Sequence, residues 1–233
     1  MKIVLDAGHG LLTPGKQTPD GEKEWVFNNA VLLAVQAKLF TVKTVQLLRV
    51  DDSTGKTDDP LKQRTDRANA WNADLYLSFH HNAHTGVWGD WGGVETFTFD
   101  SDKANPQSVE LARRIQPRIV QAMQLRDRGV KKKNLHVLRE TRMPSVLIEG
   151  GFMDSRTDIR ALRNPLLLKA QGEAIADAVV DYYHLQKKSS TTSPLHTGST
   201  FRLLTGTFPT KEHAEKAAKQ LRNLTGWTVY IKE

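Results

Sequence analysis

The chain has 233 residues, a formal net charge of +7 and no cysteine, which excludes a thiolate nucleophile, disulfide bonds and cysteine-ligated zinc. Its length allows one full-sized α/β domain and a small second module. The positive charge favours an acidic partner such as an anionic wall polymer or membrane, or serves only solubility. Nucleic-acid binding is not expected, because the basic residues are dispersed and no RNA-binding motif or zinc-finger spacing accompanies them.

Apolar runs alternate with helix-length segments through most of the chain. In order, the pattern predicts a strand leading to His9, a loop over 10–21, a helix over 24–40, a strand over 42–50, a helix over 58–74, a strand over 75–80, a Gly- and Trp-rich loop over 84–93, a strand over 94–99, a helix over 108–125 that Pro117 kinks or restarts, a strand over 144–149, and a helix from Asn164-Pro165 to about Leu185. Near-continuous Val, Ile and Leu runs are typical of parallel strands that helices cover on both faces. We therefore expect a three-layer α/β/α domain with a twisted, mostly parallel sheet.

The composition changes after this domain. Residues 187–200 are rich in Lys, Ser and Thr and have no apolar period, which predicts a linker between a domain over 1–186 and a module over 201–233. The module shows a strand over 201–206, a helix from about 210 and a strand over 227–232, a βαβ-like unit. So short a unit buries too little apolar surface to be stable alone, so we expect it to pair with a second copy, giving a homodimer, or to dock elsewhere.

Three apolar runs end on side chains that can bind a metal or transfer protons: His9, His80 and Glu149. Because ligands of open α/β sheets bind beyond the carboxyl ends of the strands, these side chains can converge. A hydrolytic zinc site needs three protein ligands, and His9, Glu24 and His80 can supply them, with Glu149 as the general base. The histidines and Glu24 each have an ordinary structural explanation as well: a hydrogen-bonded His at a strand end, or a Glu beside the helix N-terminus. Glu149 is harder to explain in this way, because carboxylates are rarely buried unpaired.

Two neighbouring histidines are alternative ligands. His81 should point to the opposite face from His80 and is the weaker choice, whereas His84 remains a rival.

Five dispersed motifs resemble one enzyme family. They are residues 1–10 (MKIVLDAGHG), Glu24 followed by Asn28, residues 80–83 (HHNA), residues 93–96 (GVET), and residues 135–139 (LHVLR) through 144–152 (PSVLIEGGF). Over about residues 1–185 the chain is similar to zinc-dependent N-acetylmuramoyl-L-alanine amidases of the amidase-3 type. The resemblance implies a six-stranded α/β fold, one Zn²⁺ held by His9, Glu24 and His80, Glu149 as the base, and hydrolysis of the amide between N-acetylmuramic acid and L-alanine in peptidoglycan.

Other residues have two interpretations each. Asn82 could bind substrate or fix the turn after its strand, and Trp88 and Trp91 could stack on substrate or pack on the neighbouring strand. Arg64 and Arg67 are interpreted as surface or ion-pair residues. The run 131–133 (KKK) is interpreted as a solvated face that could also contact wall carboxylates.

The tail resembles the short wall-binding units of Bacillus-type phage amidases and half of a sporulation-related repeat. No secretory signal precedes the first strand, and no apolar stretch approaches the roughly 20 residues that a membrane span needs. We therefore expect a protein made in the host cytoplasm that acts on the wall after release, either a phage endolysin or a sporulation autolysin. Alternative functions are a zinc carboxypeptidase or endopeptidase on stem peptides, a wall-binding protein with a decayed site, and a glycosidase using Glu24 and Glu149.

Overall fold

The computed structural model describes residues 1–101, 105–188, 211, 212, 214, 215 and 217–219. The chain divides into two compact units, Met1–Ser189 and Ser190–Glu233, and each is described by itself. The elements of the first unit are β1 (Lys2–Ala7), α1 (Glu24–Leu39), β2 (Gln46–Arg49), α2 (Leu61–Ala70), β3 (Leu75–Asn82), β4 (Val94–Phe99), α3 (Pro106–Met123), β5 (Asp127–Lys133), α4 (His136–Arg139), β6 (Ser145–Phe152), α5 (Asp158–Leu162) and α6 (Pro165–Tyr182).

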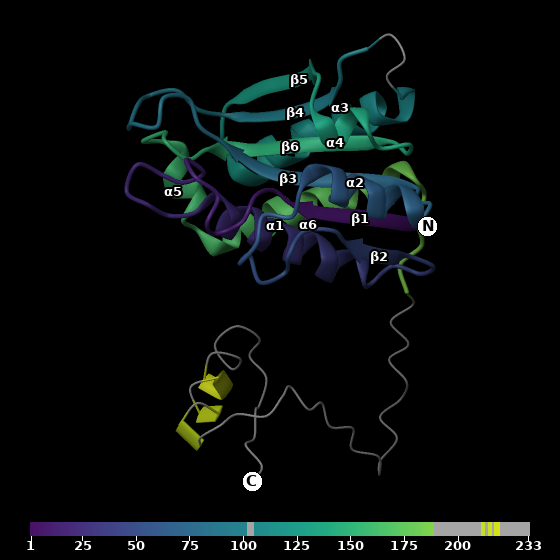
Figure 1. Cartoon of the computed structure of the whole chain (residues 1–233), viewed down its shortest axis with the longest axis horizontal. Helices are drawn as coiled ribbons and strands as arrows, with labels where there is room; N and C mark the ends of the chain where they lie inside the picture. The colour runs from purple at the N-terminus through teal and green to yellow at the C-terminus, as the bar shows by residue number, and fades with distance from the viewer. Residues whose placement is uncertain (102–104, 189–210, 213, 216, 220–233) are drawn as a thin grey trace. The chain divides into compact units, whose positions relative to one another are not determined.

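The strands form one six-stranded sheet in the order β2-β1-β3-β6-β4-β5 (Figure 1). β2, β1, β3 and β6 pair in parallel, β4 and β5 pair in parallel with each other, and β4 meets β6 antiparallel. This arrangement confirms the predicted mostly parallel sheet. It also brings the start of β4 to the sheet edge where β1, β3 and β6 end.

Helices cover both faces of the sheet, which produces the predicted three layers (Figure 1). On β1, Ile3 and Leu5 join the core under α1, α3 and α6, whereas Val4 joins a smaller core with Ala68 of α2 and Leu138 of α4. This alternation follows the two-residue period of a strand. Burial on both faces explains why the central strands are largely apolar, with Asp6 on β1 and Ser78 on β3 as buried polar exceptions.

Gly172 lets α1 and α6 approach closely. A Cβ at this position would lie 2.5 Å from the Cβ of Ala34 and 2.6 Å from the carbonyl oxygen of Val31. The α1–α6 contact therefore depends on the missing side chain.

Two helices begin as the sequence predicts. The side chain of Asn164 accepts a hydrogen bond from the Leu166 N–H at 3.0 Å, and Pro165 occupies the first helical position. Asn105 caps α3 in the same way. Pro117 lies inside α3, which is one helix from Pro106 to Met123, so the predicted restart is wrong. Among the described helices none is long and apolar enough to cross a bilayer.

Other elements differ from the sequence-based expectation. β5 was not predicted, because an edge strand rich in Lys and Arg lacks the apolar alternation that marks half-buried strands. Such charges are common on edge strands, where they prevent pairing with a further strand. β2 is shorter than the predicted strand over 42–50, since Val42 instead forms an isolated bridge with Lys187. α2 begins at Leu61, after Pro60, and ends at Ala70. The short helices α4 and α5 give no periodic signal.

In the second unit, residues 211, 212, 214, 215 and 217–219 are helical, in agreement with the helix predicted from about 210. The two strands predicted over 201–206 and 227–232 lie outside the described residues, as do residues 189–200 of the linker predicted over 187–200. The domain boundaries and the homodimer stay predictions.

Candidate active site

Parallel strands bring the predicted side chains to one sheet edge. His9 follows β1, His80 lies near the end of β3, and Glu149 is the direct register partner of His80 on β6. Glu24 is the first residue of α1, and its side chain is only 3% exposed. The fold thus gathers residues that are far apart in the sequence, because the strands that carry them are neighbours.

Three of these side chains form a compact cluster. The Nε2 of His9 lies 3.4 Å from one carboxylate oxygen of Glu24, and the Nδ1 of His80 lies 3.1 Å from the other. One ligand atom from each of the three residues lies within 4.8 Å of the others, the only such group among the described residues. Two imidazole nitrogens and a carboxylate form a donor set that suits zinc. His84 is outside this cluster, and the structure gives it no part in the candidate site.

The histidine rings are held by backbone geometry as well as by Glu24. Gly8 lies directly against the His80 imidazole, and a Cβ on Gly8 would lie 2.0 Å from its Cε1. His9 has a left-handed backbone with φ of 65°. That conformation is unusual for a residue other than glycine and turns the chain sharply at the end of β1.

A second layer of polar groups orients the Glu24 carboxylate. Its Oε1 accepts hydrogen bonds from the His81 N–H at 3.2 Å and from the Asn28 side-chain amide at 3.3 Å. Asn28 also donates to the carbonyl of Gly8 and lies 2.8 Å from the Nδ1 of His81. His81 therefore supports the cluster from behind through its N–H and Asn28, a role that the sequence did not predict.

The pKa values of the three cluster residues differ from their ordinary values. Burial lowers the pKa of His9 to about 4, against the opposing charge of Glu24. Burial opposes ionisation of Glu24 as well, but the hydrogen bond and charge of His80 and the charge of His9 lower the pKa of Glu24 to about 2. Burial acts against the protonated form of His80, yet the hydrogen bond to Glu24 raises its pKa. Glu24 is thus a carboxylate ready for a cationic partner.

Glu149 has the opposite character. Burial raises its pKa to about 8, with the charge of Glu24 adding to the effect and that of His80 opposing it. Its Oε2 is buried and has no hydrogen-bond partner. On β4, Glu95 is the antiparallel register partner of Glu149, and its own carboxylate pairs with Arg128 and with Lys131 at 2.7 Å. A carboxyl group with a raised pKa and a free oxygen is typical of a general acid–base.

The loop over 83–93 is anchored at several points. Asp154 accepts hydrogen bonds from the backbone N–H groups of residues 84–86 and from the Trp91 indole at 2.8 Å. Trp88 packs against the core, with the Arg163 guanidinium 5.8 Å from its ring centroid. These contacts favour a structural part for both tryptophans. The Asn82 side chain accepts from the Ala83 N–H at 2.9 Å, which favours its turn-fixing interpretation.

Sequence reasoning missed the buried partners of the site. Arg64 is 1% exposed and not a surface residue, although it does form the predicted ion pairs, here with Asp6 and Asp58. Arg67 pairs with Asp59. Lys131 pairs with Glu95, so the basic run is not wholly solvated. Asp6 and Glu95 are far in sequence from Arg64 and Lys131, so no local spacing indicates these two pairs. Asp58 and Asp59, in contrast, lie six and eight residues before their arginines.

The chain matches two family models. Residues 3–181 match the model described as N-acetylmuramoyl-L-alanine amidase, and residues 167–230 match the SPOR domain model. The first match spans more than half of the chain and nearly all of its first unit.

Curated relatives are wall amidases and an endolysin. An uncharacterized cell wall amidase of Bacillus anthracis is 40% identical over 78% of this chain, which spans only 35% of that protein. A sporulation-specific N-acetylmuramoyl-L-alanine amidase of Bacillus subtilis (strain 168) is 30% identical over 94% of this chain and 79% of its own length. The endolysin of Bacillus phage SPP1 is 30% identical over 82% of this chain and 69% of its own.

A solved structure has the same fold. The N-acetylmuramoyl-L-alanine amidase from Clostridium difficile 630 superimposes with a TM-score of 0.72 and 31% identity, covering 78% of this chain and 96% of that one.

Proposed function

The chain belongs to the N-acetylmuramoyl-L-alanine amidase family, and we propose that it is a zinc-dependent hydrolase of the amide between N-acetylmuramic acid and L-alanine in peptidoglycan. One observation carries the proposal: two imidazoles and a buried carboxylate form one cluster of donor atoms beside Glu149, a carboxyl group with an unpartnered oxygen. The family match supplies the substrate class.

In this proposal His9, Glu24 and His80 hold the ion. When bound, zinc polarises a carbonyl group and lowers the pKa of water to about 7. Glu149 accepts a proton from the attacking water and transfers it to the alanine nitrogen as the C–N bond breaks. The products are a free lactyl carboxylate on the sugar and a stem peptide with a new amino terminus. Asn28 and the His81 N–H keep Glu24 oriented toward the histidines throughout.

We propose that the segment matched by the SPOR model directs the enzyme to the wall. The relatives include both a sporulation amidase and a phage endolysin. We therefore propose that the enzyme acts either in the lysis of a phage host from within or in the lysis of a mother-cell wall.

End-group analysis tests the proposed bond. Gram-positive peptidoglycan is digested with the wild-type chain, Glu149→Gln, and Glu140→Gln, a matched substitution of an exposed acid on α4's C-terminal side. We expect new alanine amino termini from the wild type and Glu140→Gln but not from Glu149→Gln, and loss of activity with a chelator that added zinc reverses. New reducing sugars would indicate a glycosidase, and new amino groups on other residues a peptidase.

A further inference from the structure

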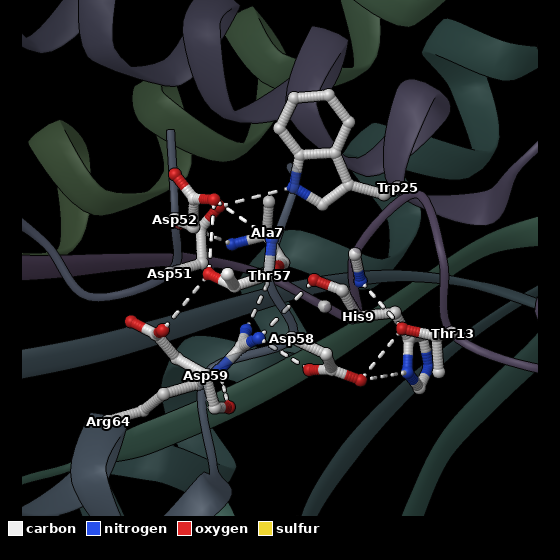
Figure 2. A network of polar contacts seen from close by, with 12 residues as sticks. Ala7, His9, Thr13, Trp25, Asp51, Asp52, Thr57, Asp58, Asp59 and Arg64 are labelled. Atoms are coloured by element: carbon white, nitrogen blue, oxygen red, sulfur yellow. Dashed lines mark hydrogen bonds and ion pairs between the residues drawn. The ribbon is translucent and has the colours of Figure 1, made fainter. Parts of the chain in front are cut away.

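The two nitrogens of His9 face different carboxylates. Its Nε2 faces Glu24, whereas its Nδ1 lies 4.0 Å from the Oδ2 of Asp58. Asp58 belongs to the loop that precedes α2, and Figure 2 shows its carboxylate between the His9 ring and the Arg64 guanidinium. Glu24 therefore occupies the side of the ring that faces the metal cluster, and Asp58 occupies the opposite side.

Arg64 connects Asp58 to the end of β1. Its Nη2 donates to Asp58 at 2.8 Å and to the His9 carbonyl at 3.3 Å. Its Nη1 donates to Asp6 at 2.7 Å. The same Nη1 donates to the Ala7 carbonyl at 2.9 Å (Figure 2). One buried guanidinium thus fixes both the backbone that carries His9 and the carboxylate behind its ring, using the fork geometry that suits arginine.

Thr13 completes the arrangement from the other side of His9. Its hydroxyl donates to the Oδ2 of Asp58 at 2.8 Å and accepts from the Gly10 N–H at 2.9 Å. Asp58 is therefore tied to residues on both sides of His9. These bonds hold the left-handed turn at His9, a backbone conformation that residues other than glycine rarely adopt without support.

Histidines that bind metals usually donate their second ring N–H to a carboxylate or carbonyl, which sets the tautomer and the ring orientation. We propose that Asp58 is the positioning residue for His9: its carboxylate, 4.0 Å from Nδ1, favours the tautomer that carries its proton on Nδ1 and leaves the Nε2 lone pair free for the metal, and it is itself held by Arg64 and Thr13. This inference rests on the proposed metal site and adds a residue to it that the sequence motifs do not include.

Asp59 provides a matched control. It is the next residue in the same loop, and its carboxylate pairs with Arg67 at 2.8 Å. Arg64 contacts Asp59 only through its backbone carbonyl. Asp59→Asn thus removes the same charge from the same loop and leaves the Arg64 contacts to Asp58 and β1 unchanged.

The experiment measures zinc affinity of the purified full chain by competition with a chelating dye, for the wild type, Asp58→Asn, Asp59→Asn, Asp58→Glu and His80→Ala. Thermal melting of each metal-free variant and the visible spectrum of its Co²⁺ form are recorded as well. We expect Asp58→Asn to raise the zinc Kd by about 10- to 100-fold and to alter the Co²⁺ spectrum. Asp59→Asn should do neither, and Asp58→Glu should recover part of the affinity.

Each result decides one question. If Asp58→Asn and Asp59→Asn bind zinc equally, the positioning role is wrong while the metal site stands, provided that His80→Ala has lost zinc. Asp58 has only a structural role if the zinc affinity of Asp58→Asn falls only in proportion to its melting temperature, and if Asp58→Glu restores neither the zinc affinity nor the melting temperature. If His80→Ala binds zinc as the wild type does, the proposed metal site fails, and the role of Asp58 fails with it.

Discussion

Replacing Glu149 by Gln should stabilise the metal-free protein while abolishing its activity. In the unfolded chain a glutamate ionises near its ordinary pKa of 4.5, whereas in the folded protein burial raises the pKa of Glu149 to about 8. Between these values the folded state binds the additional proton, so stability falls as the pH rises from about 4.5 to about 8. Each pH unit in that interval is worth about 1.4 kcal/mol, so at pH 7 the penalty is roughly 3 kcal/mol.

Glutamine keeps the shape of Glu149 without this penalty. Urea unfolding of the chelated protein should give Glu149→Gln a stability advantage that is absent below about pH 4.5, grows as the pH rises and levels off above about pH 8. Hydrolysis should fall by about 10²- to 10⁴-fold, the usual contribution of a general base. Zinc should reduce the stability gain, because a nearby cation favours the ionised carboxylate.

Glu95→Gln is the control with the opposite sign. Burial opposes ionisation of Glu95, but Lys131 and Arg128 lower its pKa, so the ionised group stabilises the fold above its unfolded pKa and loses that effect as the pH falls. Glu95→Gln should therefore be destabilised at pH 7 and less so in acid. Equal stability of Glu149→Gln and wild type at pH 5 and pH 8 would refute the burial argument.

Three further substitutions test other contacts. Arg64→Met should lower the free energy of unfolding by about 3–5 kcal/mol in urea, because it leaves Asp6 buried without its cation; a loss below about 1 kcal/mol would show that Asp6 finds other partners. Gly172→Ala should cost roughly 1–3 kcal/mol by forcing its Cβ against Ala34, and an unchanged melting temperature would contradict the close approach. Asp154→Ala should speed proteolysis of the Gly- and Trp-rich loop by removing its anchors, whereas an unchanged cleavage rate would mean that other contacts hold it.

The sheet and the strand-end residues were predictable for a physical reason. A strand buried on both faces is largely apolar, so a histidine or glutamate close to its carboxyl end is conspicuous. His9, His80 and Glu149 all satisfy that description, and the parallel topology brings them to one edge. Glu24 was predictable from its place at the start of the helix after the first loop.

The supporting residues were not predictable in the same way. Asp58 and Arg64 lie in a polar stretch that reads as a surface loop and an exposed helix, and only the tertiary structure shows that Arg64 is buried. β5 was not predicted because its basic residues do not show the alternation of apolar and polar residues that indicates a strand. In each case the deciding partner is distant in sequence, so no local spacing reveals it.

The reversed direction of β4 has an evolutionary consequence. Because β3 ends and β4 begins at the same edge, a single loop over 83–93 joins them without a helix crossing the sheet, and Asp154 ties that loop to the segment after β6. Lengthening such a connection changes neither strand register nor core, and each doubling of loop length costs only about 0.6 kcal/mol. Insertions in this segment should therefore be tolerated in evolution without disturbing the framework that holds the histidines.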